Sequence, residues 1–114
     1  MYYYVYMLKS ISPGIKKSYV GYTNNIKLRL EKHNSNKGAK TTKGYKWLLI
    51  YNKKFKSKSE AMSFEYKLKK DKAKRKTILE KFIKWKSRSY YLIKKTIHHH
   101  ILEQYLYLLI LFRK

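Results

Sequence analysis

One carboxylate of this chain falls where an apolar side chain would be expected. Ala61, Phe64 and Leu68 have the spacing of the apolar stripe of a helix, and Glu65 lies within the same stripe. Burial of a carboxylate on an inward-facing stripe costs several kcal/mol of desolvation, and this cost remains unless the carboxylate is paired with a cation or bound to a metal ion. Glu65 is therefore a candidate metal ligand, with pairing to one of the many lysines as the alternative.

Arg29 and His33 form a second group of side chains that could do chemistry. They are four residues apart, which is about one turn of a helix, so both lie on the same helical face. Arg is rare among the 29 basic residues, and its guanidinium holds phosphate with a bidentate fork, which Lys does less well. If each residue is considered singly, the simpler interpretation of Arg29 is a solvated phosphate contact. The simpler interpretation of His33 is a surface histidine or one whose hydrogen bonds are satisfied within the fold.

The first half of the chain contains elements that would position these residues. Residues 2–9 are rich in Tyr and Val, which favours a strand, and residues 17–22 predict a second strand. Ser12-Pro13-Gly14 between them predicts a type II turn, so the two strands form an antiparallel hairpin. Thr23-Asn24-Asn25 supplies N-cap side chains for a helix over residues 25–34.

The rest of the chain predicts a loop, a third strand and further helices. In chain order we expect a mobile basic loop over residues 34–44, a strand over 47–51, a helix that begins at the capping box of residues 57–60, a helical stretch over 76–86, a break at Ser87-Arg88-Ser89 and a final helix over about 90–112. His98, His99 and His100 would point in different directions on that last helix, which indicates helix surface rather than a metal site. Its apolar end is typical of a docked helix or a dimer contact.

The charge of the chain indicates a polyanionic partner. With 114 residues, of which 44% are hydrophobic, the chain has room for one domain. The 29 Lys and Arg against 6 Asp and Glu give a formal net charge of +23. This charge favours nucleic acid as the partner, although part of the Lys content also fits an AT-rich coding sequence. The absence of cysteine excludes disulfides, zinc fingers and thiol catalysis.

The sequence gives no sign of export or of a membrane span. The first ten residues lack the charged start and the apolar stretch of a signal peptide. The longest apolar run, residues 105–112, is far shorter than the ~20 residues that cross a bilayer. We therefore expect a soluble intracellular protein of the nucleus or cytoplasm.

Two short strings complete the pattern. Tyr4-Val5-Tyr6 and Tyr19-Val20-Gly21, followed by Arg29, His33 and Glu65, resemble the motifs of the GIY-YIG nuclease family, with Tyr4 in place of the usual Gly and a conservative Val20. The resemblance covers roughly residues 2–72 and is strongest to the compact single-domain members. The same stretches are similar to the nuclease domain of the structure-specific endonuclease subunit that cuts branched DNA, whose zinc-binding RING-type domain a cysteine-free chain lacks.

The resemblance implies an α/β fold, with a small three-stranded antiparallel sheet flanked by helices and a helical C-terminal extension. We expect the nuclease domain to cover residues 1–73 and the extension to cover residues 74–114. The extension is also where we expect contact with a protein partner or with a second copy of the chain.

The resemblance further implies a role for each site residue. Tyr6 takes a proton from the attacking water, Tyr19 orients water or phosphate, Arg29 binds the scissile phosphate, His33 assists the proton transfers, and Glu65 holds one Mg²⁺ or Mn²⁺ ion. A free Tyr has a pKa of ~10, so its action as a base near neutral pH requires a cationic neighbourhood. We expect the net charge of +23 to provide one. Taken alone, each tyrosine is a packed strand aromatic.

A set of lysines and one tryptophan is expected to contact DNA, because cations bind the phosphate backbone and aromatic rings stack on exposed bases. The set comprises Lys27, Lys32, Lys37, Lys40, Lys43, Lys46 and Trp47. The predicted function is divalent-metal-dependent hydrolysis of DNA phosphodiester bonds, with branched or structured DNA in repair or recombination as the candidate substrate. The alternatives are a basic nucleic-acid-binding protein that keeps the fold without cutting, and a cationic protein that binds membrane surfaces through its C-terminal helix.

Overall fold

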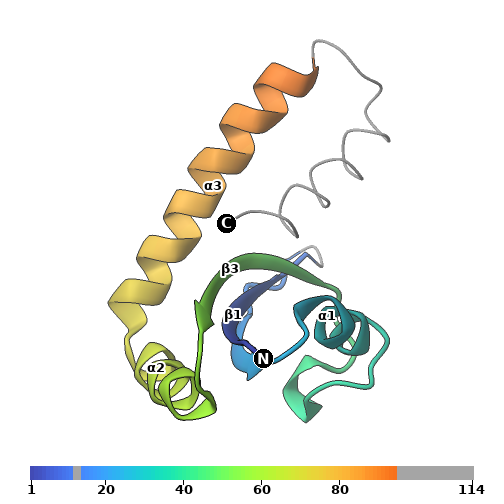
Figure 1. The fold of residues 1–114 in the computed structure, drawn as a ribbon. Helices are drawn as coiled ribbons and strands as arrows, with labels where there is room; N and C mark the ends of the chain where they lie inside the picture. The colour runs from blue at the N-terminus through green and yellow to red at the C-terminus, as the bar shows by residue number, and fades with distance from the viewer. Residues whose placement is uncertain (12–13, 95–114) are drawn as a thin grey trace.

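The fold is a three-stranded antiparallel sheet with helices on both sides (Figure 1). The computed structural model describes residues 1–11 and 14–94. In chain order the elements are β1 (Tyr3–Ser10), β2 (Ser18–Thr23), α1 (Ile26–Asn34), the 3₁₀ helix η1 (Lys40–Thr42), β3 (Trp47–Phe55), α2 (Lys58–Lys70) and α3 (Lys72–Lys94). The predicted α/β class and the three antiparallel strands are confirmed.

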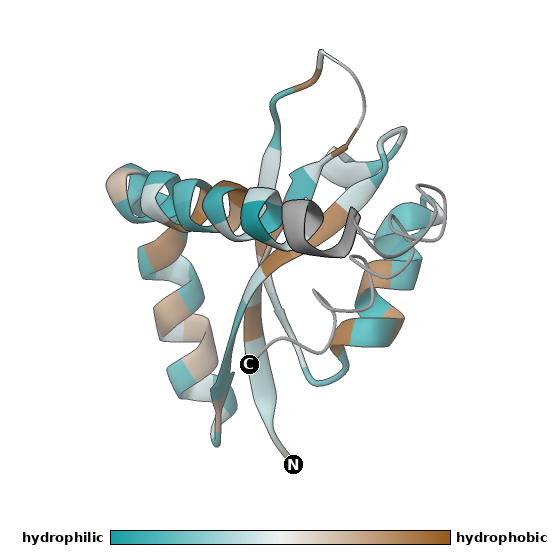
Figure 2. Ribbon diagram, turned by 90° about the horizontal axis from the view of Figure 1, so that it is seen from above, coloured by the Kyte–Doolittle hydropathy of each residue, from teal (hydrophilic) through white to brown (hydrophobic). Residues whose placement is uncertain are grey.

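β1 is the central strand of the sheet, with β2 and β3 paired antiparallel on either edge. α1 lies on one side of the sheet and α2 on the other, while α3 crosses the molecule in contact with β3 and α2 (Figures 1 and 2). Because both faces of β1 are covered, residues 5–8 are all buried instead of alternating between core and solvent. Figure 2 shows this hydrophobic middle of the sheet enclosed by largely hydrophilic helices.

Side-chain caps define where the first two helices begin. The Oδ1 atom of Asn25 accepts a hydrogen bond from the backbone N–H of Leu28 at 3.0 Å, at the start of α1. The Oγ atom of Ser57 accepts one from the backbone N–H of Glu60 at 3.1 Å, at the start of α2. Both caps stand where the sequence predicts them, and each contributes about 1 kcal/mol. They fix the helical register of the candidate site residues.

The segment between α1 and β3 is more ordered than the predicted mobile loop. It contains η1, and Thr42 within η1 is fully buried. The side chain of Asn34 holds the end of the segment, since its amide donates to the carbonyl of Trp47 at 3.1 Å and its Oδ1 accepts from the N–H of Trp47. A polar side chain whose composition indicates a loop thus forms hydrogen bonds with backbone groups of the same segment.

The predicted limits of two other elements need correction. β3 continues to Phe55, beyond the predicted end at residue 51, because β1 pairs with it along its whole length. Gly14 has a φ of 76°, the left-handed conformation expected of the predicted turn, whose residues 12 and 13 lie outside the described residues.

The predicted break at Ser87-Arg88-Ser89 is wrong, because α3 runs unbroken from Lys72 to Lys94. A serine costs only roughly 0.5 kcal/mol relative to alanine within a helix. Against this small cost, α3 buries Phe82 in the core, beside the ring of Trp85 at a centroid distance of 6.0 Å. The cost of serine within a helix is therefore too small to end α3 at these residues.

The end of the predicted final helix, with His98, His99, His100 and the apolar residues 105–112, lies outside the described residues. Within residues 1–11 and 14–94, no helix combines the length and the hydrophobicity that crossing a membrane requires.

Candidate active site

The hairpin of β1 and β2 places two tyrosines side by side. Across the two strands, Tyr6 pairs with Gly21 and Leu8 pairs with Tyr19. Because directly paired residues share a face with residues two positions away, Tyr6 and Tyr19 project from the same face of the sheet. Their ring centroids are 6.2 Å apart. The hairpin thus brings the two phenols of the sequence motif together.

Gly21 provides the space in which the ring of Tyr6 lies against β2. A Cβ atom at residue 21 would lie 2.6 Å from Oη of Tyr6 and 3.0 Å from Cε2 of Tyr19. Such distances lie well inside van der Waals contact, so a side chain at this position requires that a tyrosine move. The glycine therefore has a steric role in the position of both rings.

We expect Gly21→Ala to displace the ring of Tyr6 and to lower the free energy of unfolding by about 1–3 kcal/mol, the usual cost of overpacking. Urea unfolding gives the free energy, and the NMR signals of the tyrosine rings report their displacement. A variant that unfolds like the wild type and keeps its ring signals unchanged would contradict the steric role.

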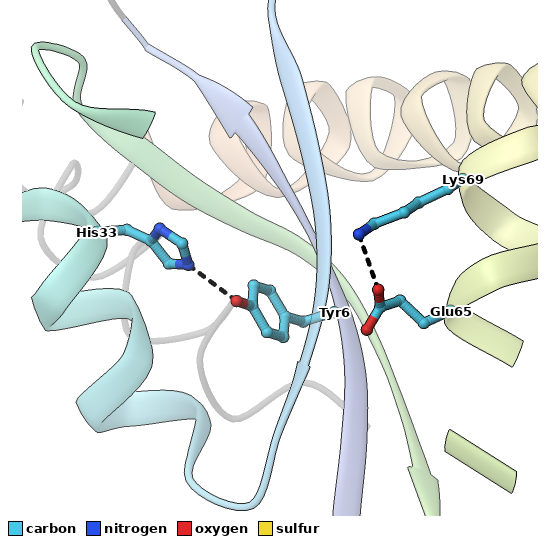
Figure 3. A network of polar contacts seen from close by, with 4 residues as sticks. All are labelled: Tyr6, His33, Glu65 and Lys69. Atoms are coloured by element: carbon cyan, nitrogen blue, oxygen red, sulfur yellow. Dashed lines mark hydrogen bonds and ion pairs between the residues drawn. The ribbon is translucent and has the colours of Figure 1, made fainter. Parts of the chain in front are cut away.

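α1 carries Arg29 and His33 to the two phenols. His33 is fully buried, and its Nε2 atom lies 2.8 Å from Oη of Tyr6 (Figure 3). Its ring centroid is 4.9 Å from that of Tyr19. Arg29, one turn earlier, is partly buried, and no carboxylate of residues 1–11 or 14–94 forms an ion pair with it. Its guanidinium is therefore available to an anion from outside the chain.

Burial and the charge of Arg29 keep His33 neutral. Burial is the larger effect, and together with the nearby guanidinium it lowers the pKa of His33 from 6.5 to about 4. The Nδ1 atom of His33 lies 2.9 Å from Oγ1 of Thr42, so both ring nitrogens have hydrogen-bond partners. His33 is therefore a neutral imidazole with a hydrogen-bond partner at each ring nitrogen, and one of these partners is Tyr6.

The lowered pKa of His33 predicts that the protein loses stability on the acid side. As the pH falls from about 6.5 to about 4, the unfolded chain binds a proton at this residue before the folded chain does, so the free energy of unfolding decreases. The interval between the two pKa values corresponds to about 3 kcal/mol, and this contribution is fully present only above pH 6.5. Urea unfolding at pH 7 and pH 4.5 should show a larger decrease for the wild type than for His33→Gln. Equal decreases would contradict a buried neutral imidazole.

The pKa of Tyr6 is shifted in the direction opposite to the one expected from net charge. Burial, with a smaller contribution from Tyr19, raises the pKa of Tyr6 well above 10, although Arg29 acts in the opposite direction. Tyr6 is only 2% exposed. The desolvation free energy of a phenolate at this position is larger than the stabilisation that the charge of one guanidinium provides. The predicted cationic activation of Tyr6 is therefore wrong for the protein alone, in which Tyr6 is a neutral phenol bonded to His33.

One pocket of about 520 Å³ gathers residues from four elements. It is lined by Tyr6 of β1, Tyr19 of β2, Arg29 of α1 and Glu65 of α2. His33 is not part of the lining and reaches the pocket through Tyr6. The charge of Glu65 also acts on the phenol of Tyr6, which agrees with their position in one pocket.

Glu65 forms the lysine pair that the sequence offers as one alternative, and it also lines the pocket. Its Oε1 atom forms an ion pair with Nζ of Lys69 at 2.8 Å, one helical turn later (Figure 3). The side chain of Glu65 is 15% exposed, and that of Lys69 is 50% exposed. The carboxylate is therefore paired and also contributes to the wall of the pocket.

The donor set of the pocket fits a hard divalent ion with few protein ligands. Within residues 1–11 and 14–94, no group of three His, Cys, Asp or Glu side chains is arranged to hold a metal. Glu65 is the single carboxylate of the lining, beside phenolic oxygens. Mg²⁺ and Mn²⁺ accept oxygen ligands, and Mg²⁺ retains several waters, so one carboxylate with a substrate phosphate is a suitable environment.

Sequence reasoning missed several residues that the fold brings to the site. Lys58 lines the pocket seven residues before Glu65, and this spacing of two helical turns is the signal that could have found it. Gly38 lies against His33, where a Cβ atom would come within 2.5 Å of Nδ1. The contact between His33 and Thr42 has no signal in the local sequence.

The predicted DNA contacts divide into exposed lysines and a buried tryptophan. All six lysines are exposed, although Nζ of Lys46 donates to the carbonyl of Asn34 at 2.8 Å. Trp47 is 2% exposed, and its Nε1–H donates to the carbonyl of Thr42 at 2.9 Å. The expectation that Trp47 stacks on exposed bases is therefore wrong, since its ring belongs to the core.

Comparison with known proteins shows which families and proteins this chain is similar to. Residues 2–78 match the GIY-YIG catalytic domain. A UPF0213 protein of Oceanobacillus iheyensis is 46% identical over 68 residues, which cover 59% of this chain and 76% of that protein. A UPF0213 protein of Staphylococcus haemolyticus is 44% identical over 68 residues, which cover 59% of this chain and 79% of that protein. The solution NMR structure of a UPF0213 protein from Bacillus halodurans aligns at 36% identity with a TM-score of 0.41, covering 70% of this chain and 84% of that one. Because the match to the GIY-YIG catalytic domain covers more than half of the sequence, the chain belongs to that family.

Proposed function

We propose that this protein is an endonuclease that hydrolyses DNA phosphodiester bonds with the help of one Mg²⁺ or Mn²⁺ ion. The observation that carries the proposal is the single pocket in which Tyr6, Tyr19, Arg29 and Glu65 meet. These residues come from four elements of a GIY-YIG catalytic domain. All of them lie within residues 1–73, which we propose as the nuclease unit.

Phosphodiester hydrolysis needs a group that binds the phosphate and a site for positive charge. Arg29 is the phosphate-binding group, because its partly buried guanidinium has two parallel N–H donors for a phosphate. Glu65 is the residue that would hold the divalent ion. When bound, such an ion neutralises charge on the phosphate and makes a bound water more acidic.

Tyr6 and His33 act as a pair in the removal of the proton from water. Because burial raises the pKa of Tyr6, a free phenolate is scarce at neutral pH. Oη of Tyr6 therefore accepts the proton of the attacking water while its own proton passes to Nε2 of His33, 2.8 Å away. The water becomes hydroxide, Tyr6 remains a phenol and His33 becomes an imidazolium. Tyr19, beside both rings, orients the water or the phosphate.

The surface supplies attraction to DNA without sequence readout. The exposed lysines on α1 and on the segment 37–46, together with a net charge of +23, favour binding to the phosphate backbone and predict strong salt dependence. We keep Lys27, Lys32, Lys37, Lys40, Lys43 and Lys46 as proposed backbone contacts.

The alternative of a nucleic-acid-binding protein that does not cut would share this charge and this salt dependence. Two features of the pocket favour catalysis over binding alone. Binding of a polyanion requires neither a largely buried carboxylate at residue 65 nor a buried phenol–imidazole pair. A carboxylate beside the phosphate would oppose binding unless a cation lay between them.

The test is a cleavage panel with duplex, flap, splayed-arm and four-way DNA, in the presence of Mg²⁺ or Mn²⁺ and with a chelator as control. Glu65→Gln protein prepared in parallel controls for a contaminating nuclease. Cleavage by the wild type that requires the divalent ion supports the proposal, and the panel identifies the preferred DNA structure. Binding of every substrate without cleavage of any would favour the alternative.

A further inference from the structure

Three buried side chains form a continuous hydrogen-bonded chain behind the pocket. Oη of Tyr6 lies 2.8 Å from Nε2 of His33, Nδ1 of His33 lies 2.9 Å from Oγ1 of Thr42, and Oγ1 of Thr42 lies 2.8 Å from the carbonyl oxygen of Ala39. Tyr6 is 2% exposed, and His33 and Thr42 are 0% exposed. The chain of contacts is therefore closed to bulk water, except where Tyr6 meets the pocket.

The carbonyl of Ala39, at the end of this series of hydrogen bonds, determines where each proton of the series lies. The carbonyl of Ala39 can only accept, so the hydroxyl of Thr42 donates its single proton to it. Oγ1 of Thr42 is then left as an acceptor for His33, which places the imidazole proton on Nδ1. Since the pKa of His33 is lowered to about 4, the ring carries only one proton at neutral pH. Nε2 is therefore a free acceptor, and Tyr6 donates to it.

We infer that Thr42 is a positioning residue of the active site, which fixes His33 in the Nδ1–H tautomer so that Nε2 is the acceptor for the proton of Tyr6. The catalytic part of this inference rests on the proposed function, whereas the tautomer does not. In the opposite tautomer, Nε2–H would point at Oη of Tyr6 and His33 would have no lone pair for the phenolic proton. The proton that passes from water through Tyr6 would then have no acceptor.

The surroundings of Thr42 are built to hold its hydroxyl in place. The backbone N–H of Thr42 donates to Ala39 at 3.0 Å, and its carbonyl accepts from Nε1 of Trp47 at 2.9 Å. Gly38 allows the segment to lie directly against His33, because a Cβ atom there would come within 3.0 Å of Cα and of Cγ of His33. This arrangement gives Trp47 and the segment between α1 and β3 a role in the site, although neither lines the pocket.

The acceptor on Thr42 matters most after proton transfer. When Nε2 of His33 receives the proton of Tyr6, both ring nitrogens carry protons and the ring becomes positive. Oγ1 of Thr42 then accepts from Nδ1–H while Oη of Tyr6 faces Nε2–H, so neither N–H of the buried cation is left unsatisfied. Valine at residue 42 has nearly the same shape but offers no acceptor.

The first test reads the tautomer by ¹⁵N–¹H NMR of the imidazole ring. Replacing His98, His99 and His100 by Gln leaves His33 as the single histidine of the chain. In this background we expect the Nδ1–H tautomer at pH 7. Thr42→Val should move the population to Nε2–H, because an orphaned buried N–H is costlier than an orphaned lone pair. Thr42→Ser, which keeps the hydroxyl, should retain the Nδ1–H tautomer.

Two outcomes of this experiment would overturn the inference. One is an Nε2–H tautomer in the background protein itself, a result that requires no change at residue 42. The other is a folded Thr42→Val protein that keeps the Nδ1–H tautomer in full. Both outcomes are readable whether or not the protein cleaves DNA, so failure of the proposed function remains distinguishable from failure of the tautomer assignment.

The second test reads catalysis by single-turnover cleavage. Thr42→Val should lower the rate of the chemical step by about 10- to 100-fold, the range found when a group that orients a metal-bound histidine is lost, taken here by analogy. The apparent affinity for DNA should remain unchanged, and Thr42→Ser should restore most of the rate. Equal losses for Thr42→Val and Thr42→Ser, or a loss confined to DNA affinity, would assign Thr42 a merely structural role.

Discussion

Replacement of Glu65 by Gln is expected to lower the rate of DNA cleavage by at least about 10³-fold while DNA affinity is retained. The carboxylate is the single acidic group of the pocket, so its loss removes the proposed protein ligand of the divalent ion and, with it, several kcal/mol of charge stabilisation in the transition state. Glu65→Gln should change the free energy of unfolding by less than about 1 kcal/mol, because its partner Lys69 is half exposed. Single-turnover cleavage measures the rate, and fluorescence anisotropy in a chelator measures the affinity.

Glu60→Gln is the matched control for this substitution. Glu60 is an exposed carboxylate in the first turn of the same helix, α2, and lies outside the pocket, so its replacement should leave the cleavage rate within about 2-fold of the wild type. Wild-type cleavage by Glu65→Gln would show that no metal ligand is needed at this position. Equal losses in both variants would point to a general effect of charge on α2.

Tyr6→Phe is expected to lower the rate of the chemical step by about 10³-fold, within the range found for the loss of a general acid or base. The phenol is the group that faces both the pocket and Nε2 of His33, so its removal interrupts the proposed path of the proton. The variant also leaves the buried Nε2 atom without its partner, which should lower the free energy of unfolding by about 1–3 kcal/mol. Cleavage kinetics below the unfolding transition, together with urea unfolding, measure the two effects separately.

Tyr51→Phe makes the same chemical change in the same sheet but outside the pocket. Tyr51 is half-buried on β3, where burial raises the pKa of its phenol. We expect its replacement to leave the cleavage rate unchanged. A Tyr6→Phe protein that is folded and cuts at the wild-type rate would remove Tyr6 from the proton path, and the role of His33 would be lost with it.

The positions of the candidate site residues were largely predictable because their signals are local or carried by a motif. The caps at Asn25 and Ser57 stand where the sequence places them, which fixes the helical spacing from Arg29 to His33 and the position of Glu65. The richness in Tyr and Val, with a turn between the two segments, predicted the hairpin whose register sets Tyr6 beside Tyr19. Short-range hydrogen bonds and side-chain spacing decide these features, so they can be derived from neighbours in the chain.

Two errors arose where distant segments decide the outcome. Net charge suggested that Tyr6 would have a lowered pKa, but two covered faces of β1 bury the phenol, and desolvation raises the pKa. Trp47 was expected at the DNA interface because it adjoins many lysines, yet β3 turns its ring into the core. A further error was local: the serines near residue 88 suggested a helix end, but their cost within a helix is small and α3 continues past them.

The sequence by itself determined the identity of the chemical groups, the class of the fold and the helical spacing within each element. Only the tertiary structure decided that Glu65 and the two phenols line one pocket, that His33 is neutral and that Thr42 directs its proton. The reason is that solvation and hydrogen-bond partnership depend on what packs against a group. Tyr6 meets a histidine 27 residues later in the chain, and that histidine meets a threonine nine residues further on.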